Sequence, residues 1–170
     1  MNEYVKLFRP VTLVAPMIGA LMFGLMGIST SNLWGQWWKI PVIAFIFAVS
    51  NAAGNVVNQV YDVELDRMLG PPKSLRPIPS GRVSWQNANS FAVLLFGLTL
   101  VLGFVINISF GLVLAVIGFF AWTYSAPPRL KRYLILSNLA IATPRGGLGV
   151  LATYLAFAPL DWKIISASLF

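Results

Sequence analysis

The chain has 170 residues, of which 58% are hydrophobic and 10% are charged, and its mean hydropathy is +0.77. Soluble domains carry about a quarter charged residues, so this composition excludes an ordinary soluble domain and indicates membrane-spanning helices. The net charge of +7 suits an anionic lipid surface, and no soluble basic face of the kind that binds nucleic acid is visible.

Five apolar runs are each close to the roughly 20 residues that a helix needs to cross a bilayer. Helices satisfy their own backbone hydrogen bonds there. The predicted fold class is therefore all-α, a multi-pass transmembrane helical bundle with five complete spans plus the start of a sixth. The complete spans are Val11 to Ser29, Pro41 to Val60, Asn89 to Val105, Phe110 to Ser125 and Leu134 to Ala158, and the sixth begins near Ile164.

Nine of the twelve basic residues lie on one side of this bundle, before the first span or in the loops at about 61–88 and 126–133. Because basic loops tend to stay on the cytoplasmic side, the pattern predicts a cell-membrane protein whose N-terminus and both loops are cytoplasmic. We expect Lys6, Arg129 and Arg132 to act only as topology signals.

Five polar residues form a stripe along the second span, at spacings of four, three, four and four: Asn51, Asn55, Asn58, Asp62 and Asp66. On a single helix these side chains fall within roughly 80° of one another. Such groups are costly in hydrocarbon without a partner or a cavity. The chain has no cysteine and no histidine, so oxygen ligands remain, and these suit magnesium or calcium.

The two carboxylates lie at the cytoplasmic end, one turn apart, with Asn58 a turn deeper. Magnesium is typically held by one or two carboxylates plus phosphate oxygens, so this end predicts a magnesium–phosphate site. The proline-rich loop that follows, RMLGPPKSLRPIPSGR, would present Lys73 and Arg76 to phosphate at fixed positions. The alternative is a solvated cluster of salt bridges near a helix end.

The stretch NQVYDVELD followed by LRPIPSG resembles the first aspartate-rich motif of the UbiA superfamily of intramembrane prenyltransferases. YSAPPRLKR is similar to the second cytoplasmic loop of that family, and LFRP near the N-terminus also fits it. In the family, the N-x-x-x-D-x-x-x-D helix binds the magnesium diphosphate of a polyprenyl donor. The resemblance extends from about Leu7 to the end of the chain.

The resemblance implies roles for particular residues. Asn58, Asp62 and Asp66 would be the catalytic residues and would hold Mg2+. The substrate-binding residues would be Lys73 and Arg76, which neutralise the leaving diphosphate, and Asn55, Tyr124 and Lys131.

Arg145 lies midway along the fifth span, between Pro144 and two glycines. This pattern predicts a broken helix that lines the cavity, because an unpaired charge at this depth would be costly. We include Arg145 among the candidate substrate-binding residues. Pairing with a helix carbonyl or a carboxylate is the alternative.

The implied function is Mg2+-dependent transfer of a polyprenyl group, geranylgeranyl by preference, from its diphosphate to a lipid-soluble acceptor in the membrane. The sequence is closest to the archaeal-lipid and chlorophyll branches, which favours a glycerol-phosphate lipid precursor as acceptor. Aromatic acceptors of the quinone or tocopherol type and a chlorophyll-type acceptor are alternatives. An ion transporter and a truncated, non-catalytic membrane protein are alternatives of another class.

Members of the family have further spans and a second aspartate-rich motif, whereas Asp161 is the only acidic residue after Asp66. Residues 1–170 are therefore expected to be the N-terminal part of an intramembrane prenyltransferase domain.

Overall fold

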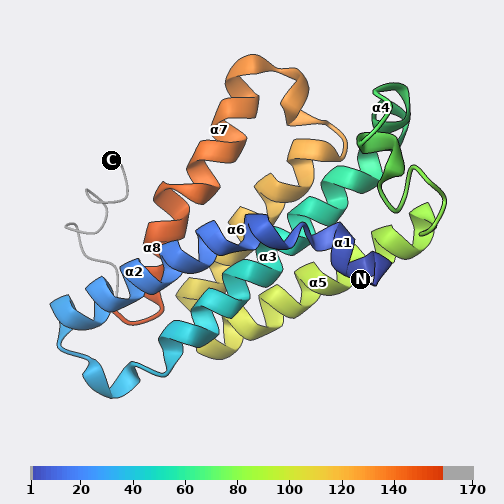
Figure 1. The fold of residues 1–170 in the computed structure, drawn as a ribbon. Coiled ribbons are helices and arrows are strands. Elements are labelled where there is room, and N and C mark those ends of the chain that lie inside the picture. The colour runs from blue at the N-terminus through green and yellow to red at the C-terminus, as the bar shows by residue number, and fades with distance from the viewer. Residues whose placement is uncertain (1, 159–170) are drawn as a thin grey trace.

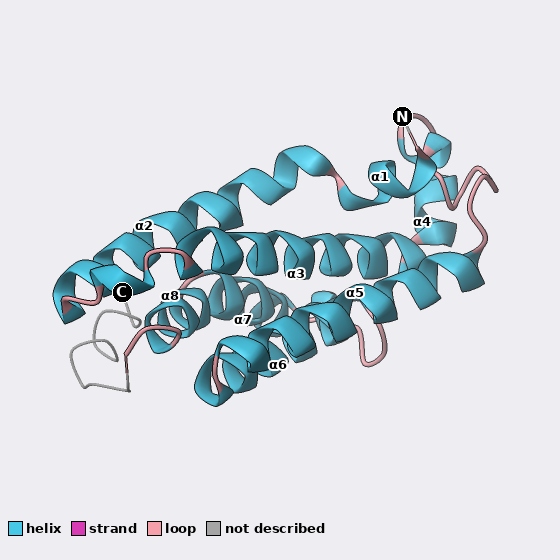
Figure 2. Cartoon of the chain, turned by 90° about the horizontal axis from the view of Figure 1, so that it is seen from below, coloured by secondary structure: helices cyan, strands magenta, loops and turns pink. Residues whose placement is uncertain are grey.

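The long apolar runs form the long helices of the protein. A computed structural model describes residues 2–158, which contain helices and no strand (Figure 1, Figure 2). The α-helices are α1 (Glu3–Phe8), α2 (Val14–Ser31), α3 (Lys39–Tyr61), α4 (Val63–Met68), α5 (Trp85–Ile106), α6 (Ile108–Ser125), α7 (Leu134–Arg145) and α8 (Gly147–Leu155). Short 3-10 turns occur at Pro10–Leu13, Trp34–Gln36, Lys73–Leu75 and Leu130–Arg132.

Five helical segments are long and apolar enough to cross a membrane, which confirms the predicted all-α membrane bundle. They are Pro10–Ser29, Lys39–Tyr61, Trp85–Ile106, Ile108–Ser125 and Leu134–Leu155. Each differs by only a few residues from the span predicted by hydropathy. The sixth predicted span, near Ile164, lies outside the described residues.

Helix α3 is the centre of the bundle and packs against α1, α2, α5 and α6. About 61% of its spanning window is buried, against 33% or less for the other four spans. Small and β-branched residues such as Ala53, Val56 and Val57 make this close packing possible and are fully buried. The outer helices turn large apolar side chains outward, for example Val105 and Leu134, as helices that face lipid do.

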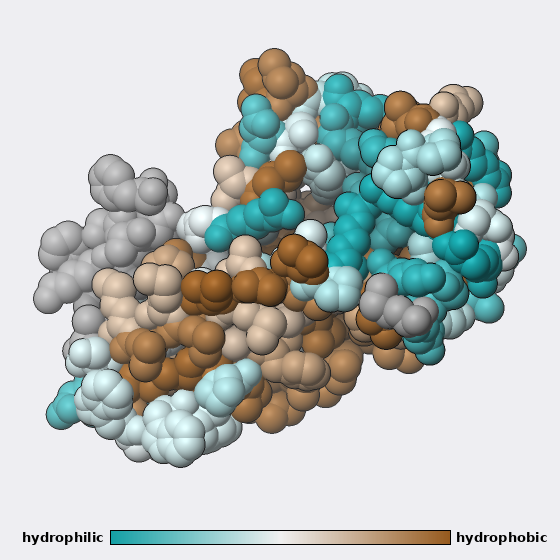
Figure 3. Space-filling model, viewed as in Figure 1, coloured by the Kyte–Doolittle hydropathy of each residue, from teal (hydrophilic) through white to brown (hydrophobic). Residues whose placement is uncertain are grey.

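The surface divides along the axis of the bundle (Figure 3). Hydrophobic residues cover the part formed by α2, α3 and α5, whereas hydrophilic residues gather at the end where α1, α4 and the loops around them lie. This polar end is the one that carries both basic loops.

Helices α5 and α6 form a tight antiparallel pair around Asn107. The Asn107 side chain accepts a hydrogen bond from the Phe110 amide (2.8 Å) and donates one to the Leu155 carbonyl (2.8 Å). It thus caps α6 and fastens the pair to the end of α8.

Two of the predicted helices are interrupted. The fifth span breaks at Gly146, as the sequence around Arg145 predicted. The prediction that the polar stripe lies on one continuous helix is wrong, because α3 ends at Tyr61 and Asp62 adopts a non-helical φ of −105° and ψ of 11°. The one-turn spacing survives the kink, since the Asp62 amide donates to Asn58 (3.1 Å) and the Asp66 amide donates to Asp62 (2.8 Å).

The close approach of α5 and α6 gives a stability prediction. A Cβ atom at Gly111 would lie 2.4 Å from Phe104 Cδ1, so Gly111→Ala must displace the Phe104 ring or separate the helices. We expect a loss of roughly 1–3 kcal/mol in unfolding free energy, the usual cost of overpacking. Gly97→Ala on α5, where a Cβ meets nothing within 4 Å, is the matched control and should melt in detergent like the parent. Equal melting temperatures for the two variants would contradict the packing.

Candidate active site

The basic loop at about 126–133 reaches Asp62, at the end of the central helix. Asp62 Oδ1 accepts hydrogen bonds from Arg129 Nη2 (3.0 Å) and from Lys131 Nζ. Arg129 Nη2 also donates to the Tyr61 carbonyl (3.2 Å). Asp62 is 9% exposed, so it is a nearly buried carboxylate held by two cations from a loop more than 60 residues away in sequence.

The second carboxylate lies on α4 and is bound by the loop that follows this helix. Asp66, which is 2% exposed, accepts a bond from Arg76 Nη1 at 2.6 Å. The loop is held in shape by Arg67 Nε, which donates to the Pro79 carbonyl (3.3 Å), and by Arg82 Nη2, which donates to the Leu75 carbonyl (2.5 Å). Arg76 therefore contacts one of the two carboxylates, and its binding to phosphate stays a prediction.

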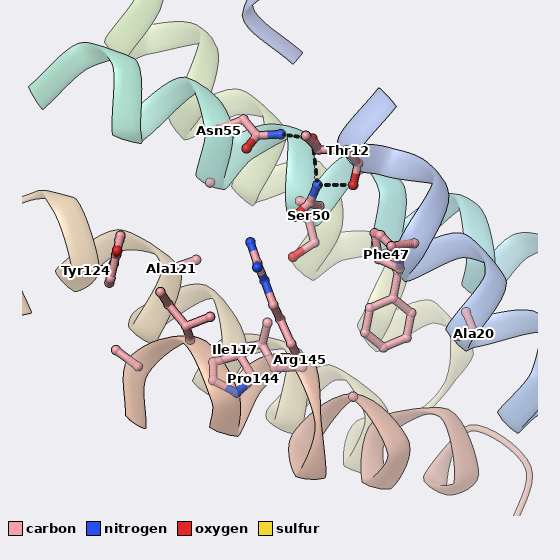
Figure 4. Close-up of a pocket in the computed structure, with 18 of the residues that line it drawn as sticks. Thr12, Ala20, Phe47, Ser50, Asn55, Ile117, Ala121, Tyr124, Pro144 and Arg145 are labelled. Carbon is pink, nitrogen blue, oxygen red and sulfur yellow. Dashed lines mark hydrogen bonds between the residues drawn. The ribbon is translucent and has the colours of Figure 1, made fainter. Parts of the chain in front are cut away.

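A cavity of about 580 Å³ lies beneath this cluster, between α3 and the helices α2, α6, α7 and α8 (Figure 4). This volume is typical of a small-molecule site. Apolar side chains such as Phe47 and Ile117 make up much of the lining. Its polar side chains are Arg9, Thr12, Ser50, Asn51, Asn55, Asn58, Tyr124, Arg145 and Thr153.

Three amides of α3 hold the chain where α1 ends and the first span begins. Gln59 Nε2 donates to Leu7 (2.8 Å), Asn55 Nδ2 to Phe8 (2.8 Å) and Asn51 Nδ2 to Thr12 (3.0 Å), in each case to the backbone carbonyl. Only an N–H group can donate to a carbonyl, so the orientation of these amides is fixed. The oxygens of Asn51 and Asn55 accept no hydrogen bond within residues 2–158, beside the cavity that both residues line.

Arg9 lies in the segment between α1 and the first span that these amides hold, and this segment places Arg9 near Asp62 and Asp66. Its backbone is left-handed, with φ 52° and ψ 69°, and the side chain lines the cavity. Burial lowers the pKa of the Arg9 guanidinium below its usual range. Repulsion from Arg76 lowers this pKa further, while Asp66 and Asp62 raise it. Arg9 is therefore coupled to both carboxylates, although sequence reasoning counted it only among the basic residues of one side.

The remaining predicted site residues are placed as follows. Asn58 lines the cavity and donates to Ser125 Oγ (3.0 Å). Tyr124 lines it too, and the Lys131 ammonium lies 6.0 Å from the centre of its ring. Lys73 is exposed and makes no ion pair with another described residue, so its binding role stays a prediction.

Arg129 corrects one expectation. We expected it to act only as a topology signal, yet it bonds Asp62 and Tyr61 from inside the cluster. The turn that carries it has a left-handed φ of 60°, which directs the side chain back toward α3 rather than into the surrounding water. Sequence spacing gave no sign of this, because the contact joins distant segments.

Comparison with known proteins identifies the family and the fold. Residues 17–170 match the UbiA prenyltransferase family. The chain belongs to this family. The resemblance seen in its motifs is thereby confirmed, and the kinked helix with Asp62 and Asp66 is the part of the chain that carried it.

Relatives within the family point to one type of enzyme. The chain is 32% identical over 165 residues to the digeranylgeranylglyceryl phosphate synthase of Saccharolobus solfataricus, covering 96% of this chain and 55% of that protein. It is 29% identical over 146 residues to the enzyme of the same name from Methanosphaera stadtmanae, covering 86% and 50%. The chain thus spans about half the length of the curated relatives it matches.

Solved structures of the family have the same fold. A structure of digeranylgeranylglyceryl phosphate synthase superposes with a TM-score of 0.82 at 27% identity, covering 98% of this chain and 56% of that one. A UbiA homologue from Archaeoglobus fulgidus, bound to DMAPP and Mg2+, superposes with a TM-score of 0.78 at 21% identity, covering 98% and 59%. The second likeness concerns the fold alone.

The buried pair between Asp66 and Arg76 gives a second prediction. Asp66→Asn removes the charge that holds Arg76, and we expect a cost of roughly 1–3 kcal/mol and a loosened loop. Trypsin should then cut several times faster after the exposed Lys73. Glu64→Gln breaks only the exposed pair with Arg67 and should leave the cutting rate unchanged. Equal rates for both variants would show that the Asp66 pair does not hold the loop.

Proposed function

We propose that the protein containing this chain transfers a geranylgeranyl group from its diphosphate to a glycerol-phosphate lipid precursor, in a Mg2+-dependent reaction. The observation that carries the proposal is the pair of buried carboxylates, Asp62 and Asp66, each bound to basic side chains at one end of a membrane-embedded cavity. The names of the listed relatives support the choice of acceptor and prenyl group, and UbiA homologues bound to DMAPP or GPP with Mg2+ support a prenyl diphosphate as donor.

Each of the two carboxylates has one oxygen that is free to bind magnesium. The cations contact Oδ1 of Asp62 and Oδ2 of Asp66, while the other oxygen of each has no partner within residues 2–158. In the same range, no group of three or more acidic, cysteine or histidine side chains forms a closed metal cage. Magnesium commonly takes one or two carboxylates and completes its shell with water and phosphate. Asp62 and Asp66, with the Asn58 oxygen nearby, would hold the ion, which would supply charge neutralisation for the leaving diphosphate.

The basic side chains of the cluster would bind the donor. Arg76, Arg129 and Lys131 now contact the carboxylates and would be shared with diphosphate oxygens, an arrangement in which arginine forks are effective. The donor C–O bond then breaks and its electron pair leaves with the diphosphate, the acceptor hydroxyl oxygen forms an ether bond to the allylic carbon, and the hydroxyl proton passes to the departing diphosphate. Apolar lining residues such as Ala20, Phe47 and Ile117 would contact the prenyl chain and exclude water.

Activity of the full-length protein tests this function. Asp62→Asn and Asp66→Asn should each lower geranylgeranyl transfer roughly a hundredfold or more, since each removes charge that positions the diphosphate. Labelled geranylgeranyl diphosphate and geranylgeranylglyceryl phosphate, with purified protein in lipid vesicles, provide the measurement. Glu64→Gln, an exposed neighbour on α4, is the control and should stay within about twofold of the parent.

Three results would contradict the proposal. Prenyl transfer in the absence of magnesium would contradict the proposed role of Asp62 and Asp66 as magnesium ligands. Transfer to an aromatic acceptor only would favour the quinone-type alternative. Ion flux through the reconstituted protein without prenyl transfer would favour a transporter.

We also propose that the N-terminus and both basic loops face the cytoplasm. The support is the gathering of nine basic residues at the end of the bundle that carries Asp62. The 170 residues contain no cysteine, so single cysteines can be introduced in full-length protein from which any other cysteine has been removed. With a membrane-impermeant maleimide on intact cells, Gly35→Cys should react and Gln86→Cys should react only after permeabilisation. The reverse pattern would invert the topology.

A further inference from the structure

Arg145 is a charge in the middle of the membrane. It is the last residue of α7, eleven positions after Leu134, and so lies about 16 Å along the helix from its start. This is close to the midplane of a hydrocarbon layer about 30 Å thick. Within residues 2–158 the guanidinium makes no ion pair and no hydrogen bond, and the residue is exposed. Charges at this depth usually have a partner or mark a ligand path.

The side chain points into the cavity. Figure 4 shows Arg145 extending from α7 across the space toward Ser50 and Asn55 on α3. The other basic residues of the site contact carboxylates or lie beside them at the end of α3, whereas Arg145 faces no carboxylate within the described residues. The exposed surface of the Arg145 side chain therefore faces the cavity.

The opposite wall has the complementary chemistry. The N–H groups of Asn51 and Asn55 are engaged by backbone carbonyls, so these residues offer their oxygens, which can only accept hydrogen bonds. One wall of the cavity thus offers a cation, which suits an anion, and the other offers hydrogen-bond acceptors, which suit a hydroxyl group. A prenyl chain alone would use neither.

We propose that Arg145 binds the anionic head group of the acceptor, a phosphate monoester or a carboxylate, while the oxygens of Asn51 and Asn55 accept the hydrogen bond of the acceptor hydroxyl. This inference rests on the proposed prenyl transfer and adds a second anion site to it. Asn51 and Asn55 precede Asp62 by eleven and seven residues, or roughly 16 and 10 Å along α3. A diphosphate held around Asp62 would leave Arg145 uncompensated, so the two anions occupy separate places.

A purely structural role accounts less well for this geometry. A cation in the last turn of a helix interacts favourably with the helix dipole. Yet the guanidinium hydrogen-bonds none of the carbonyls at the end of α7, and it is directed away from that helix (Figure 4). Because the helix is broken at Gly146, Arg145 can extend into the cavity instead of lying along a continuous helix.

Kinetics of the full-length protein test the role of Arg145. Arg145→Gln should raise the KM for geranylgeranylglyceryl phosphate roughly ten- to a hundredfold, the usual loss for a hydrogen bond to a charged group. The KM for geranylgeranyl diphosphate should change less than twofold. Arg145→Lys should recover part of the loss, because it keeps the charge and loses the fork. Arg132→Gln, at an exposed arginine whose side chain makes no hydrogen bond or ion pair in the described chain, should change neither constant.

Direct binding separates this inference from the proposed function. Calorimetric titration without donor should show geranylgeranylglyceryl phosphate binding that Arg145→Gln weakens roughly ten- to a hundredfold, even if the protein transfers nothing. Loss of 4-hydroxybenzoate binding instead would identify a carboxylate as the anion. Unchanged acceptor binding and KM in Arg145→Gln, with a lowered melting temperature, would overturn the inference and show a structural charge paired elsewhere in the protein. A wild-type protein that binds the acceptor but transfers no prenyl group would contradict the proposed function alone.

Discussion

The site depends on the compensation of two carboxylates buried at the end of a membrane helix. An isolated carboxylate in such a place would be strongly destabilised, so Asp62 and Asp66 require cations close by. The chain supplies them from two separate loops: Arg129 and Lys131 follow α6, and Arg76 follows α4. These ion pairs join the end of α3 to both loops. The requirement to compensate buried charge therefore also assembles the site: Asp62 at the kink binds one loop, and Asp66 on α4 binds the other.

A second constraint comes from backbone groups at a break between helices. The end of α1 leaves carbonyls without helical partners, and in an apolar environment each one must find a donor. Gln59, Asn55 and Asn51 supply these donors at one-turn intervals along α3. The same bonds hold the left-handed Arg9 beside the carboxylates and orient the asparagine oxygens. One row of amides thus serves both the fold and the wall of the cavity.

Hydropathy was sufficient to predict the five spans, because a membrane helix must be both long and apolar. The break at Gly146 was also predictable, because Pro144 and two consecutive glycines flank Arg145 in the fifth span. The kink at Asp62 was not, because the spacing of the stripe fits a straight helix equally well. The roles of Arg9 and Arg129 depend on contacts between distant segments and on left-handed backbone turns. A loop arginine that fixes topology and one that binds a buried carboxylate look the same in sequence.

The balance of charge separates the two parts of the site. Around Asp62 and Asp66, two carboxylates face four basic groups, Arg9, Arg76, Arg129 and Lys131, which leaves an excess of two positive charges. A diphosphate that enters together with a divalent cation brings a small net charge, so the cluster can bind both without a large build-up of either sign. Arg145 stands outside this balance, because its charge is unmatched among residues 2–158 and lies a long way down the cavity. A monoanionic or dianionic head group satisfies it without disturbing the cluster above. Two anions can then occupy one cavity, each with its own cations, and the reacting carbon and hydroxyl are brought together between them.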